Sequence, residues 1–499
     1  MRKTSILATV AIGLASALAL AGCAGASSSA GGSGATIAIG SLYEPVNLDN
    51  TAGGGQGVTE ALNGNVYEGL FKLTDDGKVE QLLATKYTTS ADGLTYTFTL
   101  RDGVKFHSGA ALTSSDVKRS IERVTAADSQ SARKSQLDVI SKIDTPDTKT
   151  VTISLKSRSI SLPYNLSYVW IYGPGTSNYK TAEDGTGPYT LGSWKRGSSL
   201  SLKRWSGYWG HQATNKGVEF DYFTDASALS NALKTKQVDI VTSIQSPDAL
   251  SGFTNDKNYT ISNGKSTTKE LLAFNDKVAP FNKAEVRKAI YSAIDRKKLL
   301  NSIWGDYGTL IGSMVPPSDP WYEDLTKVNP YDVNLAKKEL AEAGFANGFS
   351  FTLDTPTYDP HPAVAEFLKS ELAKVGVTVN INSISADEWY TKAFKNHDFT
   401  ATLQEHVNDR DVVWYGNPDF YWGYDNPQVT QWVNEAEQAR TTAEQTAKLK
   451  LVNEQIAKDA ASAWLYLYPQ IVVAASDVTG YPLNGLNSQF FVYGIKKAK

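Results

Sequence analysis

Apolar and polar residues alternate along the chain with two distinct periods. Strict alternation over residues 94–100 and 149–155 predicts strands with one buried face. Short apolar runs predict further strands at 36–40, 238–241, 351–353, 377–381 and 399–403. A helical spacing of apolar residues predicts helices at 63–70, 113–123, 226–233, 283–300, 334–343 and 363–375. This alternation of helices and strands indicates an α/β protein with partly parallel sheets.

The N-terminal segment differs from the rest of the chain. Arg2 and Lys3 precede an apolar stretch from Ile6 to Leu20, and small residues follow it. A basic start, an apolar run that is short for a membrane span, and small residues before a cleavage point indicate a secretory signal over residues 1–22. The next segment, 23–35, is rich in Gly, Ala and Ser after its first residue and is expected to be a flexible tether.

The only cysteine, Cys23, ends the sequence Leu20-Ala21-Gly22-Cys23, which resembles the bacterial lipobox. In a lipobox the cysteine becomes the mature N-terminus and carries diacylglycerol on its sulfur. The resemblance implies a palmitate-type lipid anchor on the outer face of the cytoplasmic membrane, within the periplasm if the organism has an outer membrane. More than one acyl chain is needed for firm anchoring, because a single chain binds only marginally. A membrane anchor helix is the alternative for this segment.

Charge and motif content exclude several functions. The net charge is -3 and no basic run is interleaved with aromatics, which argues against a nucleic-acid partner. The histidines are scattered, the single cysteine rules out a thiolate metal site, and no Gly-x-Ser-x-Gly elbow occurs. The glycines at 53–55 lack the spacing of a phosphate-binding loop. The sequence therefore predicts a protein that is not an enzyme and has no cofactor or metal.

Several motifs, in a fixed order, resemble extracellular solute-binding proteins of family 5, which include the oligopeptide- and dipeptide-binding proteins of ABC importers. The longest motif runs from Ser90 to Gly109 and continues through Leu112-Thr113 and Asp116-Val117. The others are Tyr67-Glu68-Gly69-Leu70, Gly185-Thr186-Gly187-Pro188-Tyr189 with Trp194, Tyr208-Trp209, Gln237-Val238-Asp239-Ile240, Ala273-Phe274-Asn275, and Val286-Arg287-Lys288-Ala289-Ile290 with Ala293-Ile294-Asp295-Arg296. Together they cover nearly all of the chain that follows the signal.

The resemblance implies a periplasmic-binding-protein-like fold of type II, in which two main lobes surround a ligand cleft and a third, family-specific lobe is added. The expected division is lobe I at 36–68, 187–272 and 472–499, the extra lobe II at 69–186, and lobe III at 273–471. Hinges are expected near 272–275 and 471–473, because a ligand held between lobes closes them by rotation.

The resemblance also implies a site for the ligand. In peptide-binding relatives the loop after a lobe III strand places an aspartate against the peptide amine, and Asp409 and Asp411 are the candidates here. Their neighbours in this charged stretch are Glu405, His406, Asn408 and Arg410, followed by Trp414 and Tyr421. The relatives usually have Gly-Trp before the aspartate, whereas this chain has Glu405-His406, which puts an α-peptide ligand in doubt. A solvated charged loop is the alternative.

The other candidate ligand contacts lie elsewhere in the chain. Tyr43 and Glu44 follow the first predicted strand, Trp170 could add an aromatic wall from lobe II, and Asn275 falls at the crossing into lobe III. We expect a monomeric substrate-binding lipoprotein that captures peptides or related small amino compounds and delivers them to ABC permease subunits. The alternatives are an oligosaccharide, opine or metal-chelate ligand, or a solute-sensing receptor accessory.

Overall fold

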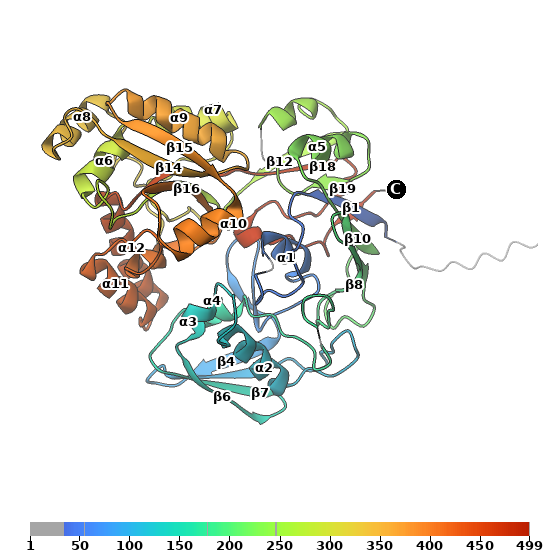
Figure 1. The fold of residues 1–499 in the computed structure, drawn as a ribbon. Coiled ribbons are helices and arrows are strands. Elements are labelled where there is room, and N and C mark those ends of the chain that lie inside the picture. Colours follow the sequence, from blue (N-terminus) through green and yellow to red (C-terminus); the bar gives the residue numbers. More distant parts are fainter. Residues whose placement is uncertain (1–33, 54, 177, 245–246, 499) are drawn as a thin grey trace, which may run out of the picture. The chain divides into compact units, whose positions relative to one another are not determined.

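The computed structural model describes residues 34–53, 55–176, 178–244 and 247–498 (Figure 1). Its largest sheet has seven strands in the order β12-β18-β11-β1-β10-β9-β8. The central strand β1 runs parallel to β10 and β11, and the other neighbours are antiparallel. Its strands are β1 (Thr36–Ser41), β8 (Tyr189–Lys195), β9 (Ser199–Arg204), β10 (Gly217–Tyr222), β11 (Ile240–Val241), β12 (Tyr259–Gly264) and β18 (Gln470–Ala475).

A four-stranded antiparallel sheet has the order β4-β5-β7-β6. The predicted alternation is confirmed in β5, where Tyr96, Phe98 and Leu100 are buried and the threonines between them are partly exposed. Helix α2 begins with a capping box between Thr113 and Asp116. The strands are β4 (Ala84–Thr89), β5 (Thr95–Leu100), β6 (Ile140–Asp147) and β7 (Thr150–Leu155), with helices α2 (Ser114–Thr125), α3 (Lys134–Leu137) and α4 (Leu162–Leu166).

A five-stranded sheet has the order β15-β14-β16-β13-β17. Strand β14 is parallel to β15 and β16, whereas β13 is antiparallel to β16 and β17. Helix α9 packs along β14 and β15 (Figure 1). The strands are β13 (Lys269–Phe274), β14 (Ser350–Pro356), β15 (Thr378–Ile384), β16 (Ala401–His406) and β17 (Ser462–Leu467). The helices are α6 (Ala284–Ser292), α7 (Arg296–Trp304), α8 (Val333–Glu342), α9 (His361–Ala373), α10 (Ala386–Trp389), α11 (Pro427–Glu437) and α12 (Thr442–Lys458).

The remaining elements are short. Helices α1 (Gly55–Leu62) and α5 (Ala226–Lys234) pack beside the seven-stranded sheet. The others are strands β2 (Phe71–Leu73), β3 (Val79–Gln81), β19 (Val478–Thr479) and β20 (Lys496–Lys497), the 3-10 turns η1 (Pro247–Gly252), η3 (Asp411–Gly416) and η4 (Leu486–Ser488), and the π-helical segment η2 (Tyr390–Lys395). The seven-stranded part is the seven-stranded sheet with helices α1 and α5 and the turn η4. The four-stranded part is the four-stranded sheet with α2, α3 and α4, and the five-stranded part is the five-stranded sheet with helices α6 to α12.

Two helix predictions are wrong. The helix lies at Gly55–Leu62 instead of 63–70, because Gly64 takes a left-handed conformation with φ of +68° and turns the chain. The predicted helix 283–300 is two helices, and the second begins where the Asp295 side chain accepts a hydrogen bond from the Lys298 backbone. A glycine turn in the first case and a helix cap in the second therefore overrode the apolar periodicity.

The chain passes between the seven- and five-stranded parts twice. The first crossing, 265–268, joins β12 to β13, and the second, 468–469, joins β17 to β18. Both crossings come a few residues before the expected boundaries at 272 and 471, which fall inside β13 and β18. The division into three lobes stays a prediction.

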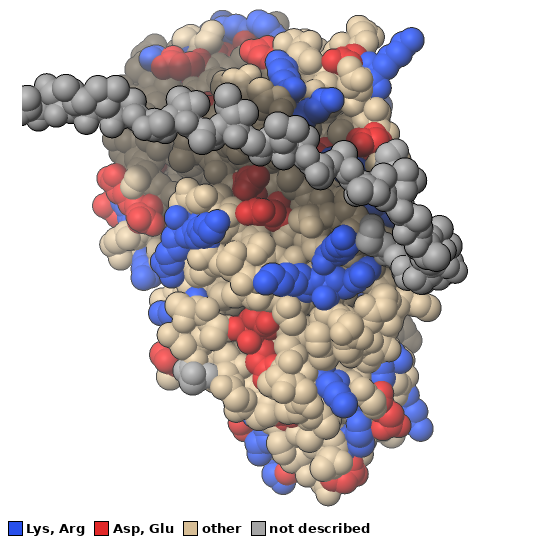
Figure 2. All heavy atoms as spheres, turned by 90° about the vertical axis from the view of Figure 1, so that its right-hand side faces the viewer, with Lys and Arg blue, Asp and Glu red and all other residues tan. Residues whose placement is uncertain are grey.

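On the face drawn in Figure 2, acidic and basic side chains are interspersed, without one large basic area. Among the described residues, none of the helices has the length and apolar character needed to cross a membrane.

Candidate functional site

A cavity of about 50 Å³ lies between the seven- and five-stranded parts, beside the two crossings. In the arrangement described, this inter-part cavity has space for only a few water molecules, by the measure of roughly 10–15 Å³ for each. A larger molecule can therefore enter it only if the seven- and five-stranded parts move further apart. The seven-stranded side contributes Tyr43, Gln56, Glu60, Thr242, Ser243, Ile244, Gln470, Gly485, Ser488, Gln489 and Phe490. The crossings and the five-stranded side contribute Ser266, Thr268, Trp304, Glu405, Val407, Tyr468 and Pro469.

Glu60 is the carboxyl group on the seven-stranded side. Helix α1 buries Val58, Ala61 and Leu62 in the core, and this places Glu60 beside the end of β1. There the Ser41 hydroxyl donates a hydrogen bond of 2.5 Å to Glu60 Oε2. Burial raises the pKa of Glu60 to about 7, although the hydrogen bonds from Ser41 and Thr242 oppose this.

Glu405 is the carboxyl group on the five-stranded side. It lies on β16 directly opposite Glu270 of β13, so both side chains are on the same face of the sheet. Burial raises the pKa of Glu405 to about 7; His361 opposes this rise and the nearby Glu270 contributes to it. Glu270 is fully buried, and burial raises its pKa to about 8.

The groups around Glu270 do not neutralise it with a fixed positive charge. The Tyr468 hydroxyl donates a short hydrogen bond to Glu270 Oε2, and His361 Nε2 lies 3.6 Å from the same oxygen. Burial lowers the pKa of His361, which favours the neutral imidazole. Glu270 Oε1 is buried without a hydrogen-bond partner among the described residues.

Two glutamates directly opposite each other destabilise a sheet, and a buried carboxyl without a cation is costly. Such departures from the rules of folding concentrate at functional sites, as do perturbed carboxyl groups in clefts. The face of the sheet that carries Glu405 is therefore the candidate site.

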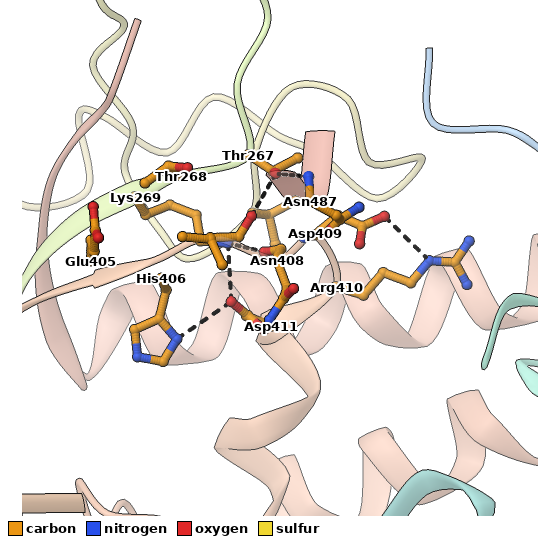
Figure 3. A network of polar contacts seen from close by, with 12 residues as sticks. Thr267, Thr268, Lys269, Glu405, His406, Asn408, Asp409, Arg410, Asp411 and Asn487 are labelled. Atoms are coloured by element: carbon orange, nitrogen blue, oxygen red, sulfur yellow. Dashed lines mark hydrogen bonds and ion pairs between the residues drawn. The ribbon is translucent and has the colours of Figure 1, made fainter. Parts of the chain in front are cut away.

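The adjoining charged residues are compensated inside the five-stranded part. Figure 3 shows Glu405 and His406 on opposite sides of β16, with His406 pointing toward Asp411. Lys269 Nζ lies 3.2 Å from Asp411 Oδ2 and also donates a hydrogen bond to the Asn408 carbonyl. Burial raises the pKa of Asp411, but Lys269 and His406 together bring it below its ordinary value. Asp411 is thus held by protein groups.

Asp409 and Arg410 contact the four-stranded part. The Tyr164 hydroxyl donates a short hydrogen bond to Asp409 Oδ1, and the Tyr168 hydroxyl lies 3.4 Å from the same atom. The Arg410 guanidinium lies 3.6 Å from the centre of the Tyr164 ring. Asp409, Arg410, Asp411 and Trp414 line a second hollow of about 360 Å³ between these parts, and none of them lines the inter-part cavity.

The remaining predicted contacts are placed elsewhere. Glu44 accepts hydrogen bonds from Trp194 Nε1 and the Gly197 backbone, at 3.1 and 2.9 Å. Trp170 is buried, stacks on Tyr67 and donates to Asn63 Oδ1. Asn275 donates to the carbonyls of His397 and Phe399. Tyr421 is buried, and its hydroxyl lies 3.0 Å from His406 Nε2.

Of the predicted contacts, the inter-part cavity brings together Tyr43 and Glu405. Sequence reasoning missed Glu60, Trp304 and Tyr468. An acidic residue directly before buried apolar residues could have indicated this site in the sequence. Glu60 precedes Ala61-Leu62, and Glu270 precedes Leu271-Leu272. His361 lies between two prolines and opens α9, where a proline is tolerated in the first turn. Cys23 lies outside the described residues.

Comparisons with known proteins agree with this architecture. Residues 78–411 match the model of the bacterial extracellular solute-binding proteins, family 5. The glutathione-binding protein GsiB of Salmonella paratyphi A is 30% identical over 370 residues, which is 70% of this chain and 70% of that protein. GsiB of Escherichia coli K12 is 29% identical over 394 residues, covering 76% and 74% of the two chains.

Solved structures show the same fold. The binding protein AgaA from A. tumefaciens R10, in complex with agropinic acid, has a TM-score of 0.79 at 25% identity over 93% of this chain and 99% of that one. DppA from Helicobacter pylori, in complex with a peptide, has a TM-score of 0.80 at 22% identity over 93% and 98% of the two chains, and supports the fold alone. The type II periplasmic-binding-protein fold is therefore confirmed, and the chain belongs to the bacterial extracellular solute-binding proteins, family 5.

Proposed function

We propose that the protein captures a small peptide-like solute, or a related amino compound, and delivers it to the permease of an ABC importer. The observation that carries the proposal is the pair of carboxyl groups, Glu60 and Glu405, that reach the inter-part cavity from its two sides. A carboxylate in a closed cleft gives a strong charge-assisted hydrogen bond to an ammonium group. The names of the relatives, which include binders of glutathione and of peptides, support the same solute class.

In this role the protein binds its solute and does not transform it chemically. Its relatives are named as binding proteins, and the polar groups of the cavity are suited to holding a solute by hydrogen bonds and charge. A monomer fits this role, because each chain carries both sides of its cavity.

The test of the solute class is mass spectrometry of the small molecule that copurifies with the mature protein. A peptide or amino compound is expected, and its retention should fall when Glu60 is changed to glutamine. A copurified neutral oligosaccharide would favour stacking on the cavity aromatics instead. Retention that is equal in wild type and Glu60→Gln would place the site outside this cavity.

The proposal includes attachment of the protein to the membrane through lipid on Cys23, within the lipobox-like sequence. Cys23→Ser removes the only thiol, so the variant is expected to be uncleaved or released into the medium. Fractionation of cells into membrane and medium, with blotting for the protein, measures this. A variant that is still processed and still membrane-bound contradicts lipid anchoring.

A further inference from the structure

The inter-part cavity has an unbalanced charge. Its described lining residues include Glu60 and Glu405 and contain neither lysine nor arginine. Glu270 adds a third carboxyl directly behind Glu405. All three are buried or partly buried, so solvent screens them weakly.

Two basic residues close to Glu270 do not balance these acids. Lys269 is next to Glu270 in β13, but alternate residues of a strand point to opposite faces, and Lys269 is paired with Asp411 on the other face. His361 is the other basic neighbour, and its burial favours the neutral form. The cavity therefore has an acidic side chain on each side, and its described lining residues offer an anion only neutral donors such as hydroxyl and amide groups.

This arrangement limits the solutes that can be enclosed. A zwitterion would satisfy one carboxylate and bring its own carboxylate against the other, where like charges repel. A neutral solute would leave both carboxylates without a countercharge, which is costly for buried groups even where, as at Glu60, a hydroxyl donates a hydrogen bond. A cationic nitrogen at each end of the solute would pair with both. The aromatic rings of Tyr43, Trp304 and Tyr468 also line the cavity and can face a cation.

We infer that the solute of this cavity is a compact organic cation that has two cationic nitrogen groups and no free carboxylate, one group held by Glu60 and the other by Glu405. The inference rests on the proposed function and narrows its solute class from amino compounds in general to diamines and amino-acid amides.

The test uses probes that differ only at the carboxylate: cadaverine, which is lysine without its carboxylate; lysinamide, in which the carboxylate is an amide; and lysine itself. Titration of the purified mature protein is followed by calorimetry and by the fluorescence of its tryptophans, one of which, Trp304, lines the cavity. Cadaverine and lysinamide should each bind at least about 10-fold more tightly than lysine, since pairing the second acid is worth on the order of 1–3 kcal/mol. Equal or tighter binding of lysine overturns the inference, as does failure of both cationic probes to bind at millimolar concentration.

Matched variants locate the binding. Glu405→Gln and Glu60→Gln should each weaken cadaverine binding by about 30-fold or more, because each removes one partner of a buried charge pair. Glu366→Gln makes the same charge change on the exposed surface of α9 and should leave the affinity unchanged. Cadaverine affinity that is unaffected by both cavity variants overturns the inference.

Different results would contradict the inference on solute charge and the proposed function. If a peptide with a free carboxylate copurifies, and its binding is weakened by Glu60→Gln, the inference on charge is wrong and the proposed function stands. If no solute binds in the cavity and the cavity variants leave solute uptake by cells unchanged, the proposed function itself is wrong.

Discussion

At the scale of single residues, the acids of the cavity reduce the stability of the unliganded protein. Burial raises the pKa of Glu60 and Glu405 from 4.5 to about 7, and that of Glu270 to about 8. Between pH 4.5 and about 8 the folded state therefore holds protons that the unfolded chain has released, so the contribution of these groups to stability falls as pH rises. Glu405 interacts with Glu270 on β13, with His361 at the start of α9 and with Tyr358 just before that helix. It also interacts with Tyr466 on β17 and with Tyr468 in the crossing that follows β17.

Glu405→Gln should consequently stabilise the unliganded protein, and more at pH 8 than at pH 5.5. Near pH 8 the glutamine replaces a buried carboxylate, whereas at low pH it replaces a neutral carboxyl group of nearly the same shape. Thermal melts of wild type and variant at the two pH values measure this difference. A stability difference that does not change with pH would show that Glu405 titrates as an ordinary surface glutamate. The same variant is expected to bind cadaverine less tightly, so stability and function change in opposite directions.

The Lys269–Asp411 ion pair is a second residue-scale feature with a measurable consequence. The side chains are 0% and 5% exposed, so removing one charge leaves the other buried and unpaired. Asp411→Asn should lower the free energy of unfolding by about 3–5 kcal/mol. Urea denaturation measures this, with Glu366→Gln as the control. A stable Asp411→Asn variant that has lost solute binding would instead support the sequence-based prediction that Asp411 contacts the solute.

At the scale of elements, local pattern predicted most strands and several helices, because burial on one face imposes a two-residue or helical period on the sequence. The helix at 226–233 and the strand at 94–100 lie where predicted, within a residue. The failures at 63–70 and 283–300 depend on a left-handed glycine and an aspartate cap, which interrupt a period without removing its apolar residues.

The candidate site was harder to predict than the elements, because its contacts join residues far apart in sequence. Glu405 was selected as part of a charged loop, yet it lies in β16, and its significance comes from the register that places Glu270 opposite. The charged residues at 409–411 were predicted to contact the ligand because the sequence around them shows no partner for their charges. Their partners in the structure, Lys269 and Tyr164, come from distant segments of the chain. A sequence shows which charges are present, whereas pairing decides which of them remain available to a solute.

At the scale of the whole molecule, contacts between the four- and five-stranded parts oppose opening of the cavity. Besides the Tyr164–Asp409 hydrogen bond, Ser159 Oγ donates to Glu437 at 2.5 Å and Gln445 Nε2 donates to Ser161 at 3.0 Å. The chain crossings at 265–268 and 468–469 join only the seven- and five-stranded parts. Rotation of the five-stranded part about these crossings would therefore break its contacts to the four-stranded part. These contacts thus stabilise the closed arrangement of the cavity.

Tyr164→Phe tests this role, because it removes the hydroxyl donor and leaves the buried Asp409 carboxylate with one fewer hydrogen bond. A hydrogen bond to a charged group is worth about 1.5–3 kcal/mol, so the variant should release the copurified solute roughly 10-fold faster or more. Stopped-flow displacement measures the rate, and X-ray scattering should show a larger radius of gyration for the solute-free variant than for solute-free wild type. Tyr390→Phe, at a position that is 46% exposed, is the control and should match wild type in both measurements. If Tyr164→Phe also matches wild type in both, opening does not require separation of the four- and five-stranded parts, and the two parts must move together.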